Sequence, residues 1–172
     1  MTQEKKEMLA ATVRHFRLPR YQEIPTVGLY LEQTTKYISQ HLDPLEENCL
    51  TSSMIANYVK KKLIASPVKK QYSRDQIAYL FFIAVAKNVL SLDNLERFIR
   101  VQERTYCLEQ AYNYFCEELE NMLAYVFGLK GSPDAVGLTH TDEKMMLRSA
   151  IIAFSYKIYL DKYFQVNADE AE

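Results

Sequence analysis

Apolar side chains recur every three or four residues along most of the chain, which is the spacing of amphipathic helices. This pattern predicts helices over residues 3–16 and 27–42, the second ended by Asp43 and Pro44. The segment between them, LPRYQEIP, has a proline near each end, which favours extended or turn geometry. We therefore expect the chain to begin with two helices joined by an extended segment.

A short helix is predicted next, because the hydroxyl of Thr51 or Ser52 can cap the first backbone N–H groups of a helix. Its inward-facing residues are Met54, Ile55, Tyr58 and Val59. Asn57, Lys60 and Lys61 then lie on the opposite face. The sequence thus predicts a short helix with an apolar inner face and a polar, basic outer face.

A turn-rich stretch separates this helix from a longer one. Pro67 stops any continuation of the helix, and residues 68–72 alternate like a small β-ribbon. Ser73 and Gln76 have the spacing of a capping box, which predicts a long helix as far as Val89. We expect one side of this helix to be buried.

Helical patterns continue through the second half of the chain. Ser91 is a suitable N-cap for a helix over residues 92–101, and a more regular apolar repeat extends from Leu108 to Val126. Gly128 follows, as glycine commonly does after the end of a helix. The second half is therefore predicted to contain helices only.

The last predicted helix differs from the others. It follows the loop KGSPDAVGLTHT, and Thr141 with the acidic residues after it is typical of a helix start. Residues 145–164 are apolar on nearly all sides, so this helix must be covered all round. We expect it either to lie at the centre of the second half or to pair with a second copy of the chain.

Composition is that of a folded, mainly helical protein. Of 172 residues, 48% are hydrophobic and 25% are charged, and glycine plus proline number only nine. The three cysteines include no CxxC pair, so neither a disulfide framework nor a zinc finger is indicated. The longest apolar run, residues 77–86, is too short to cross a membrane, and the N-terminus has no signal-peptide pattern. We expect a cytoplasmic protein without membrane contact.

Charge is divided unevenly along the chain, although the formal net charge is only -1. Residues 1–102 carry a net charge of +5, and residues 103–172 carry -6. No carboxylate occurs between Glu47 and Asp75. That interval contains six cationic residues: Lys60, Lys61, Lys62, Lys69, Lys70 and Arg74. Because clustered cations repel one another, we expect an anionic polymer, double-stranded DNA, as partner.

The chemistry of these side chains assigns them roles at DNA. An asparagine such as Asn57 can read an adenine edge, and lysines contact phosphate or guanine. The serines could present hydroxyl and N–H groups to a phosphate, although simple capping is the plainer explanation. The predicted DNA-binding residues are Ser52, Ser53, Asn57, Lys60, Lys61, Lys69, Lys70 and Arg74. A solvated helix face is the alternative for the helical residues.

Several motifs resemble the bacterial family called domain of unknown function 1836. They are LPRYQEIP, GLYLEQ, LTSSMIANYVKKKLI, PVKKQYSRDQIAYL and SLDNLERF, which together span about residues 18–100. The resemblance implies a winged helix and no established activity.

The central block also resembles the winged helix-turn-helix of MerR-type transcription regulators. The corresponding stretches, in the same order, are MIANYVKKKLIASP, VKKQYS, RDQIAYLFFI and SLDNLERFI. The chain departs from that pattern at Ala56, where arginine is usual, and at Lys62, where glycine is usual; its wing also lacks a glycine. Two packed helices replace the long coiled coil of that family, so its promoter-twisting mechanism is not carried over.

No pattern of an enzyme is present in the sequence. His15, His41 and His140 lie in separate segments without the spacing of metal ligands, and there is no Gly-rich phosphate loop or GxSxG motif. Cys107 and Cys116 are expected to be buried. We therefore expect no catalysis, no cofactor and no metal.

The sequence predicts a mainly helical protein with a small β-wing. We expect an N-terminal helix in residues 1–19, a MerR-like winged helix-turn-helix in 20–102 and an all-helical lobe in 103–172. The predicted function is transcription regulation by a homodimer joined through the last two helices. Two alternatives remain: a helical module that binds an acidic protein, and a sensor whose second half binds a small molecule, for instance among Tyr112, Phe115, Tyr156, Tyr159 and Tyr163.

Overall fold

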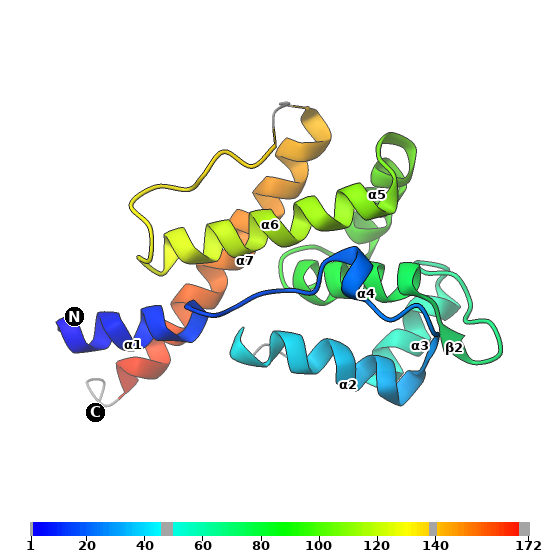
Figure 1. Cartoon of the computed structure of the whole chain (residues 1–172), viewed down its shortest axis with the longest axis horizontal. Helices are drawn as coiled ribbons and strands as arrows, with labels where there is room; N and C mark the ends of the chain where they lie inside the picture. The colour runs from blue at the N-terminus through cyan, green and yellow to red at the C-terminus, as the bar shows by residue number, and fades with distance from the viewer. Residues whose placement is uncertain (1, 46–49, 138–140, 169–172) are drawn as a thin grey trace.

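The computed structural model describes residues 2–45, 50–137 and 141–168 and is mainly helical, as predicted (Figure 1). Its α-helices are α1 (Gln3–Val13), α2 (Leu31–Leu42), α3 (Ser52–Lys60), α4 (Arg74–Ala86), α5 (Leu92–Thr105), α6 (Leu108–Val126) and α7 (Asp142–Val166). Short 3-10 turns, η1 (Tyr21–Glu23) and η2 (Asp43–Leu45), and strands β1 (Leu29–Tyr30) and β2 (Gln71–Tyr72) complete the list.

Strand β1 corrects the predicted helix over residues 27–42, which begins only at Leu31. Leu29 lies opposite Tyr72, and Tyr30 opposite Gln71, in an antiparallel pair. Gly28 permits this approach, since a Cβ atom there would lie 2.8 Å from the Cβ of Gln71. A pairing partner more than 40 residues away thus replaces the first helical turn that local periodicity predicted.

The predicted capping residues are confirmed. Thr51 accepts a hydrogen bond from the backbone N–H of Met54 at 3.2 Å. Ser73 and Gln76 form the capping box, with the Ser73 N–H donating to Gln76 Oε1 at 2.8 Å. Helix ends differ by a few residues from the prediction: α1 ends at Val13, α4 at Ala86 and α5 at Thr105. The N-cap residues therefore predicted the first residue of these helices more closely than the apolar pattern predicted the last residue.

Helix α4, rather than the last helix, is the central element of the core. Nine of its 13 residues are buried, on all its sides. Phe81 on α4 is fully buried and meets the rings of Tyr37, His41 and Tyr112 at centroid distances of 5.7–6.2 Å. Helices α2, α6 and α7 pack against it. Of the two options predicted for α7, complete cover within the chain does not hold, because one side of α7 remains exposed; pairing with a second copy stays a prediction.

Residues 18–25 tie the first half of the chain to the second half. Arg20 forms two hydrogen bonds of 2.7 Å to the carboxylate of Glu120 on α6, and the backbone N–H of Leu18 donates to the same carboxylate at 2.9 Å. The N–H of Tyr21 donates to Asn113 Oδ1 at 2.8 Å. This ion pair raises the pKa of Arg20. Hydrogen bonds to Glu120 and Asn113 therefore hold the segment that follows α1, blue in Figure 1, against α6.

The three predicted divisions of the chain stay predictions. Packing crosses the predicted boundary at residue 102, because α4 from the first half contacts both α6 and α7 from the second half. Helix α1 contacts α6, α7 and η2.

Cys116 is buried, and burial raises its pKa to about 12. Cys107 is exposed, contrary to expectation, because it is the N-cap residue of α6 and not part of its inner face. His140 and Cys49 lie outside the described residues.

Glu118 on α6 provides a pH test of the core. Its side chain is fully buried, with Arg148 Nε 3.1 Å from Oε1, and burial raises its pKa while Arg148 lowers it in part. An acid with a raised folded-state pKa stabilises the fold below its unfolded-state pKa, and that contribution is lost as the pH rises through the folded-state pKa. We expect Glu118→Gln to raise the melting temperature at pH 7 by about 2 °C, with a difference that shrinks toward pH 4.

Thermal melts between pH 4 and 8 measure this difference. Glu117→Gln is the matched control, because Glu117 is exposed on the same helix and should change little. A wild-type protein that is more stable than Glu118→Gln at pH 7 would mean that the attraction to Arg148 exceeds the cost of burying the carboxylate.

Candidate nucleic-acid interface

Helix α3 presents the predicted polar face to solvent. Ile55 and Tyr58 are buried on its inner side, and burial raises the pKa of Tyr58. Ser53, Asn57 and Lys60 are exposed, and their spacing of four and three residues places them on one side of the helix. In the described part of the chain, no hydrogen bond engages the Asn57 amide. The outer face of α3 therefore presents the side-chain amide of Asn57, without a hydrogen bond to any described residue, next to Lys60 at the end of the helix.

Five lysines follow from the end of α3 to the turn before β2, and we call them the basic end: Lys60, Lys61, Lys62, Lys69 and Lys70. All five are exposed. Among the described residues, no carboxylate forms an ion pair with any of them. Figure 1 shows α3 and the loop leading to β2 at one end of the molecule, with α1 and the last turns of α7 at the other. The structure thus concentrates uncompensated positive charge at one end.

Lys69 and Lys70 form the tip of a tight hairpin. The backbone N–H of Gln71 donates to the carbonyl of Val68 at 2.9 Å, which closes a two-residue turn. Lys69 has φ 50° and Lys70 has φ 65°, so both adopt the left-handed conformation of a type I′ turn. Asparagine and glycine are the usual residues there, since a Cβ atom makes this conformation costly. The turn is sharp although its sequence lacks glycine.

Lys62 is a third lysine in the left-handed region, with φ 59°. It follows the end of α3, where the N–H of Leu63 donates to the carbonyl of Tyr58 at 2.9 Å and that of Lys62 to Val59 at 3.0 Å. This is the Schellman arrangement, in which glycine is preferred at the left-handed position. Among the described residues, every non-glycine residue with positive φ is thus a lysine of the basic end.

A groove of about 1080 Å³ lies beside these lysines. Lys62 and Lys69 both line it, which brings the end of α3 and the hairpin to one depression. Asp75 and Glu103 also line the groove, so its charge is mixed rather than uniformly positive. Two lysines that are seven residues apart in sequence can therefore contact one extended partner.

Other predicted site residues already have partners within the protein. Arg74 donates from Nε to the carbonyl of Ile24 at 2.9 Å and from Nη2 to that of Gln22 at 3.3 Å, and its guanidinium lies 5.3 Å from the ring centre of Tyr21. The Ser52 hydroxyl lies 3.5 Å from that of Thr35. Arg74 thereby holds residues 22–24, and a DNA contact from Arg74 or Ser52 stays a prediction.

A family comparison matches residues 19–115 to the domain of unknown function DUF1836. The match covers more than half of the 172 residues and includes the whole basic end. The chain belongs to the DUF1836 family. No curated protein and no solved structure matches the chain. The likeness to MerR-type regulators therefore rests on the sequence motifs alone.

Sequence reasoning left two features of the DUF1836 domain out of the candidate site. Lys62 was counted among the clustered cations but not among the predicted DNA-binding residues, yet it is exposed and lines the groove. Val68 and Tyr30 are 75% and 52% exposed next to the hairpin tip. Period-two alternation could have marked Val68 as outward, whereas Tyr30 required knowledge of strand β1.

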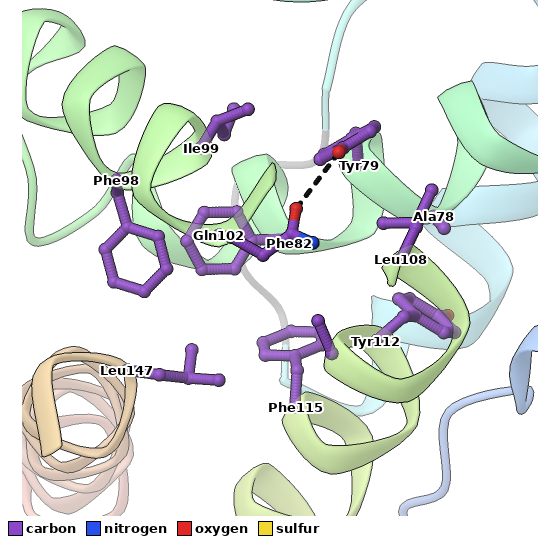
Figure 2. A pocket seen from close by; sticks show the side chains of 11 residues that line it. Ala78, Tyr79, Phe82, Phe98, Ile99, Gln102, Leu108, Tyr112, Phe115 and Leu147 are labelled. Atoms are coloured by element: carbon purple, nitrogen blue, oxygen red, sulfur yellow. Dashed lines mark hydrogen bonds between the residues drawn. The ribbon is translucent and has the colours of Figure 1, made fainter. Parts of the chain in front are cut away.

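A small apolar cavity of about 40 Å³ lies farther along the DUF1836 domain (Figure 2). It is bounded by α4, α5 and α6, with only Leu147 contributed by α7, so it is not between the last two helices. The Tyr79 hydroxyl donates to Gln102 Oε1 at 3.0 Å, and Gln102 Nε2 donates to the carbonyl of Tyr106 at 2.8 Å. Tyr79 and Gln102 thus have hydrogen-bond partners, whereas the buried hydroxyl of Tyr112 has none among the described residues; Phe82 and Phe115 form the walls.

The aromatic residues proposed to line an effector pocket are not brought together. Tyr112 and Phe115 line the cavity, whereas Tyr156 is exposed and Tyr159 stacks near Tyr163 at 6.3 Å. Within the ranges that the structure describes, no three histidine, cysteine, aspartate or glutamate side chains gather to hold a metal ion. None of the described helices has the length and apolar character to cross a membrane.

Proposed function

We propose that the chain is a DNA-binding transcription regulator that acts in the cytoplasm as a homodimer. The observation that carries this proposal is the basic end, whose five exposed lysines form no ion pair with a described carboxylate. Double-stranded DNA offers about one negative charge per 1.7 Å of helix axis, so it gains more from such a surface than a small anion does.

The order of elements supports a winged helix-turn-helix reading of this region. Strand β1 precedes α2, α3 follows, and a hairpin that pairs with β1 comes before α4. In that reading α3 is the recognition helix and the hairpin is the wing. We propose that the similarity to MerR-type regulators is confined to this winged helix-turn-helix region.

The roles follow from side-chain chemistry. Lys69 and Lys70 at the hairpin tip neutralise phosphates and orient the protein without reading sequence. Asn57 donates and accepts at an adenine edge in the major groove, and Lys60 and Lys61 contact phosphate or guanine near it. Ser53 lies in the first turn of α3, where N–H groups favour a phosphate. No cofactor takes part.

Fluorescence anisotropy with a labelled random duplex of 24 base pairs tests the proposal. We expect binding whose affinity falls with salt at a log-log slope of about -0.9 per neutralised phosphate, which gives roughly -4.5 for the five lysines of one basic end. Selection of bound fragments from a random duplex pool would then yield the preferred sequence. No retention on duplex at 50 mM salt would contradict the proposal.

A module that binds an acidic protein is the second candidate. Lys62 and Lys69 would pair with carboxylates of such a partner, while Asp75 and Glu103, which line the same groove, would favour an acidic protein that also carries some cationic side chains over a uniformly anionic polymer. Such a protein would not be retained on duplex DNA, so the same measurement separates the two candidates.

A further inference from the structure

Helix α7 exposes a row of large apolar side chains. Of ten such exposed side chains in the described residues, four belong to α7: Met145 at 55%, Tyr156 at 46%, Leu160 at 49% and Phe164 at 66%. Its other side is buried through Leu147, Ile151, Phe154 and Ile158. In Figure 1 this helix, orange to red, crosses α6 and ends near α1. Contiguous exposed apolar surface of this kind marks an interaction site.

The exposed face consists of a ridge beside a groove. Ile152, Tyr156, Leu160 and Phe164 recur every four residues and form a row of large side chains, with Ile152 half-buried. Ser149 and Ala153, also four residues apart, form a neighbouring row of small ones and are exposed. Helices pack by placing such a ridge into such a groove. One helix thus carries both parts of a helix–helix contact.

The positions of these residues are symmetric about the middle of the helix. A two-fold axis between Phe154 and Ser155 would place residue 149 at the height of residue 160 on an antiparallel copy, and 153 at the height of 156. Each small side chain then meets a large one: Ser149 faces Leu160 of the second copy, and Ala153 faces Tyr156. A parallel copy would instead place small against small and large against large.

We propose that α7 is a self-association surface that pairs antiparallel with the α7 of a second copy of this chain. The sequence requires that an all-apolar helix be either central or paired, and α4 rather than α7 is central. An isologous contact through one two-fold axis follows from the symmetric face. The inference deepens the homodimer of the proposed function by assigning it to α7 alone, but the pairing itself requires no DNA.

The size of the face sets the strength of the pairing. From Met145 to Phe164 the exposed side chains span 20 residues, about 30 Å at a rise of 1.5 Å per residue, and a helix is about 10 Å wide. The footprint is therefore well below the ~800 Å² per partner of a standard stable interface. The dimer is weak and depends on protein concentration, and two half-sites on one duplex would strengthen it.

Disulfide crosslinking of variants with one introduced cysteine, in which the buried Cys116 is kept, determines the register. In a chain carrying Cys49→Ser and Cys107→Ser, one sample contains Ser149→Cys, a second contains Leu160→Cys, and a third mixes the two. We expect the mixture to form a disulfide-linked heterodimer under mild oxidation. Each variant alone stays unlinked, because its own two cysteines would be about 16 Å apart along the axis. Self-linking of each variant instead would overturn the antiparallel pairing.

Sedimentation equilibrium of the unmodified chain, without DNA, gives an independent measurement. We expect a monomer–dimer equilibrium that Tyr156→Glu shifts to monomer with no change in helical circular dichroism. Glu143→Gln, a substitution on the same helix outside the row, is the control and keeps the equilibrium. A monomer at 200 µM would overturn the inference. DNA binding is measured separately through the basic end, so either proposal can fail alone.

Discussion

Replacing Lys60, Lys61, Lys69 and Lys70 together with alanine should lower the affinity for duplex DNA by roughly 10³-fold. Each charge-assisted phosphate contact contributes on the order of 1 kcal/mol, and 1.4 kcal/mol is a tenfold change in affinity. The salt dependence should also flatten by about 3.6 in log-log slope, because four counterion-releasing contacts are lost. Fluorescence anisotropy at several salt concentrations measures both quantities.

A second variant with the same change in net charge controls for long-range electrostatics. It replaces Lys6, Arg14, Arg97 and Arg104 with alanine, all of which are exposed and lie outside the basic end. This control should lose less than about tenfold in affinity and keep its salt slope, since long-range effects are screened within about 10 Å at 0.1 M salt. Equal losses in the two variants would remove the assignment of the site, even if DNA binding itself persisted.

The hairpin tip should show opposite effects on stability and on binding. Replacing Lys69 with asparagine and Lys70 with glycine supplies the residues that a type I′ turn prefers. We expect the free energy of unfolding to rise by about 1–2 kcal/mol, or roughly 3–6 °C in melting temperature, because the left-handed conformation no longer bears a lysine Cβ at position 70. Affinity for duplex should fall roughly 30-fold, because two phosphate contacts of about 1 kcal/mol each are lost.

Replacement of the same two lysines with alanine separates the two effects. Alanine removes both charges but keeps a Cβ in the left-handed region, so this variant should lose the same affinity without the gain in stability. Thermal melts and anisotropy on the three proteins give the comparison. Unchanged DNA affinity in the variant with asparagine and glycine would show that these lysines do not contact DNA.

Local patterns predicted most of the helices, because caps and apolar periodicity act within a few residues. Thr51, Ser73, Ser91 and Thr141 cap helices where the sequence placed them. Strand β1 was missed because its two residues are fixed by pairing with β2, more than 40 residues away. Long-range contacts of this kind leave no periodic signal in two residues.

Burial within the chain differs from the prediction for α4, which is buried on all sides rather than one, and α7 is covered on one side only. Helix α4 carries small residues such as Ala78, Ala84 and Ala86 between its large ones, which lets other helices approach it from all sides. Helix α7 reads as uniformly apolar, yet its large side chains project from both faces while the fold covers only one. Apolar content alone therefore did not identify the central helix.

The candidate site was predictable in composition but not in conformation. The exposed outer face of α3 follows from its spacing, and so do the cations at its end. That Arg74 is used by the carbonyls of Ile24 and Gln22 depends on how residues 18–25 fold back, which no local motif specifies. The left-handed backbone of Lys62, Lys69 and Lys70 runs against residue preference, so sequence reasoning could not have predicted it.

The enclosure of α4 has a consequence for protein engineering. A fragment cut after residue 102 would lose α6 and α7, and with them the cover of Phe81 and the anchor of Arg20 at Glu120. We therefore expect that residues 1–102 do not fold as an independent, transferable unit. Variants that test or alter the proposed DNA recognition should exchange side chains on α3 and the hairpin within the intact chain.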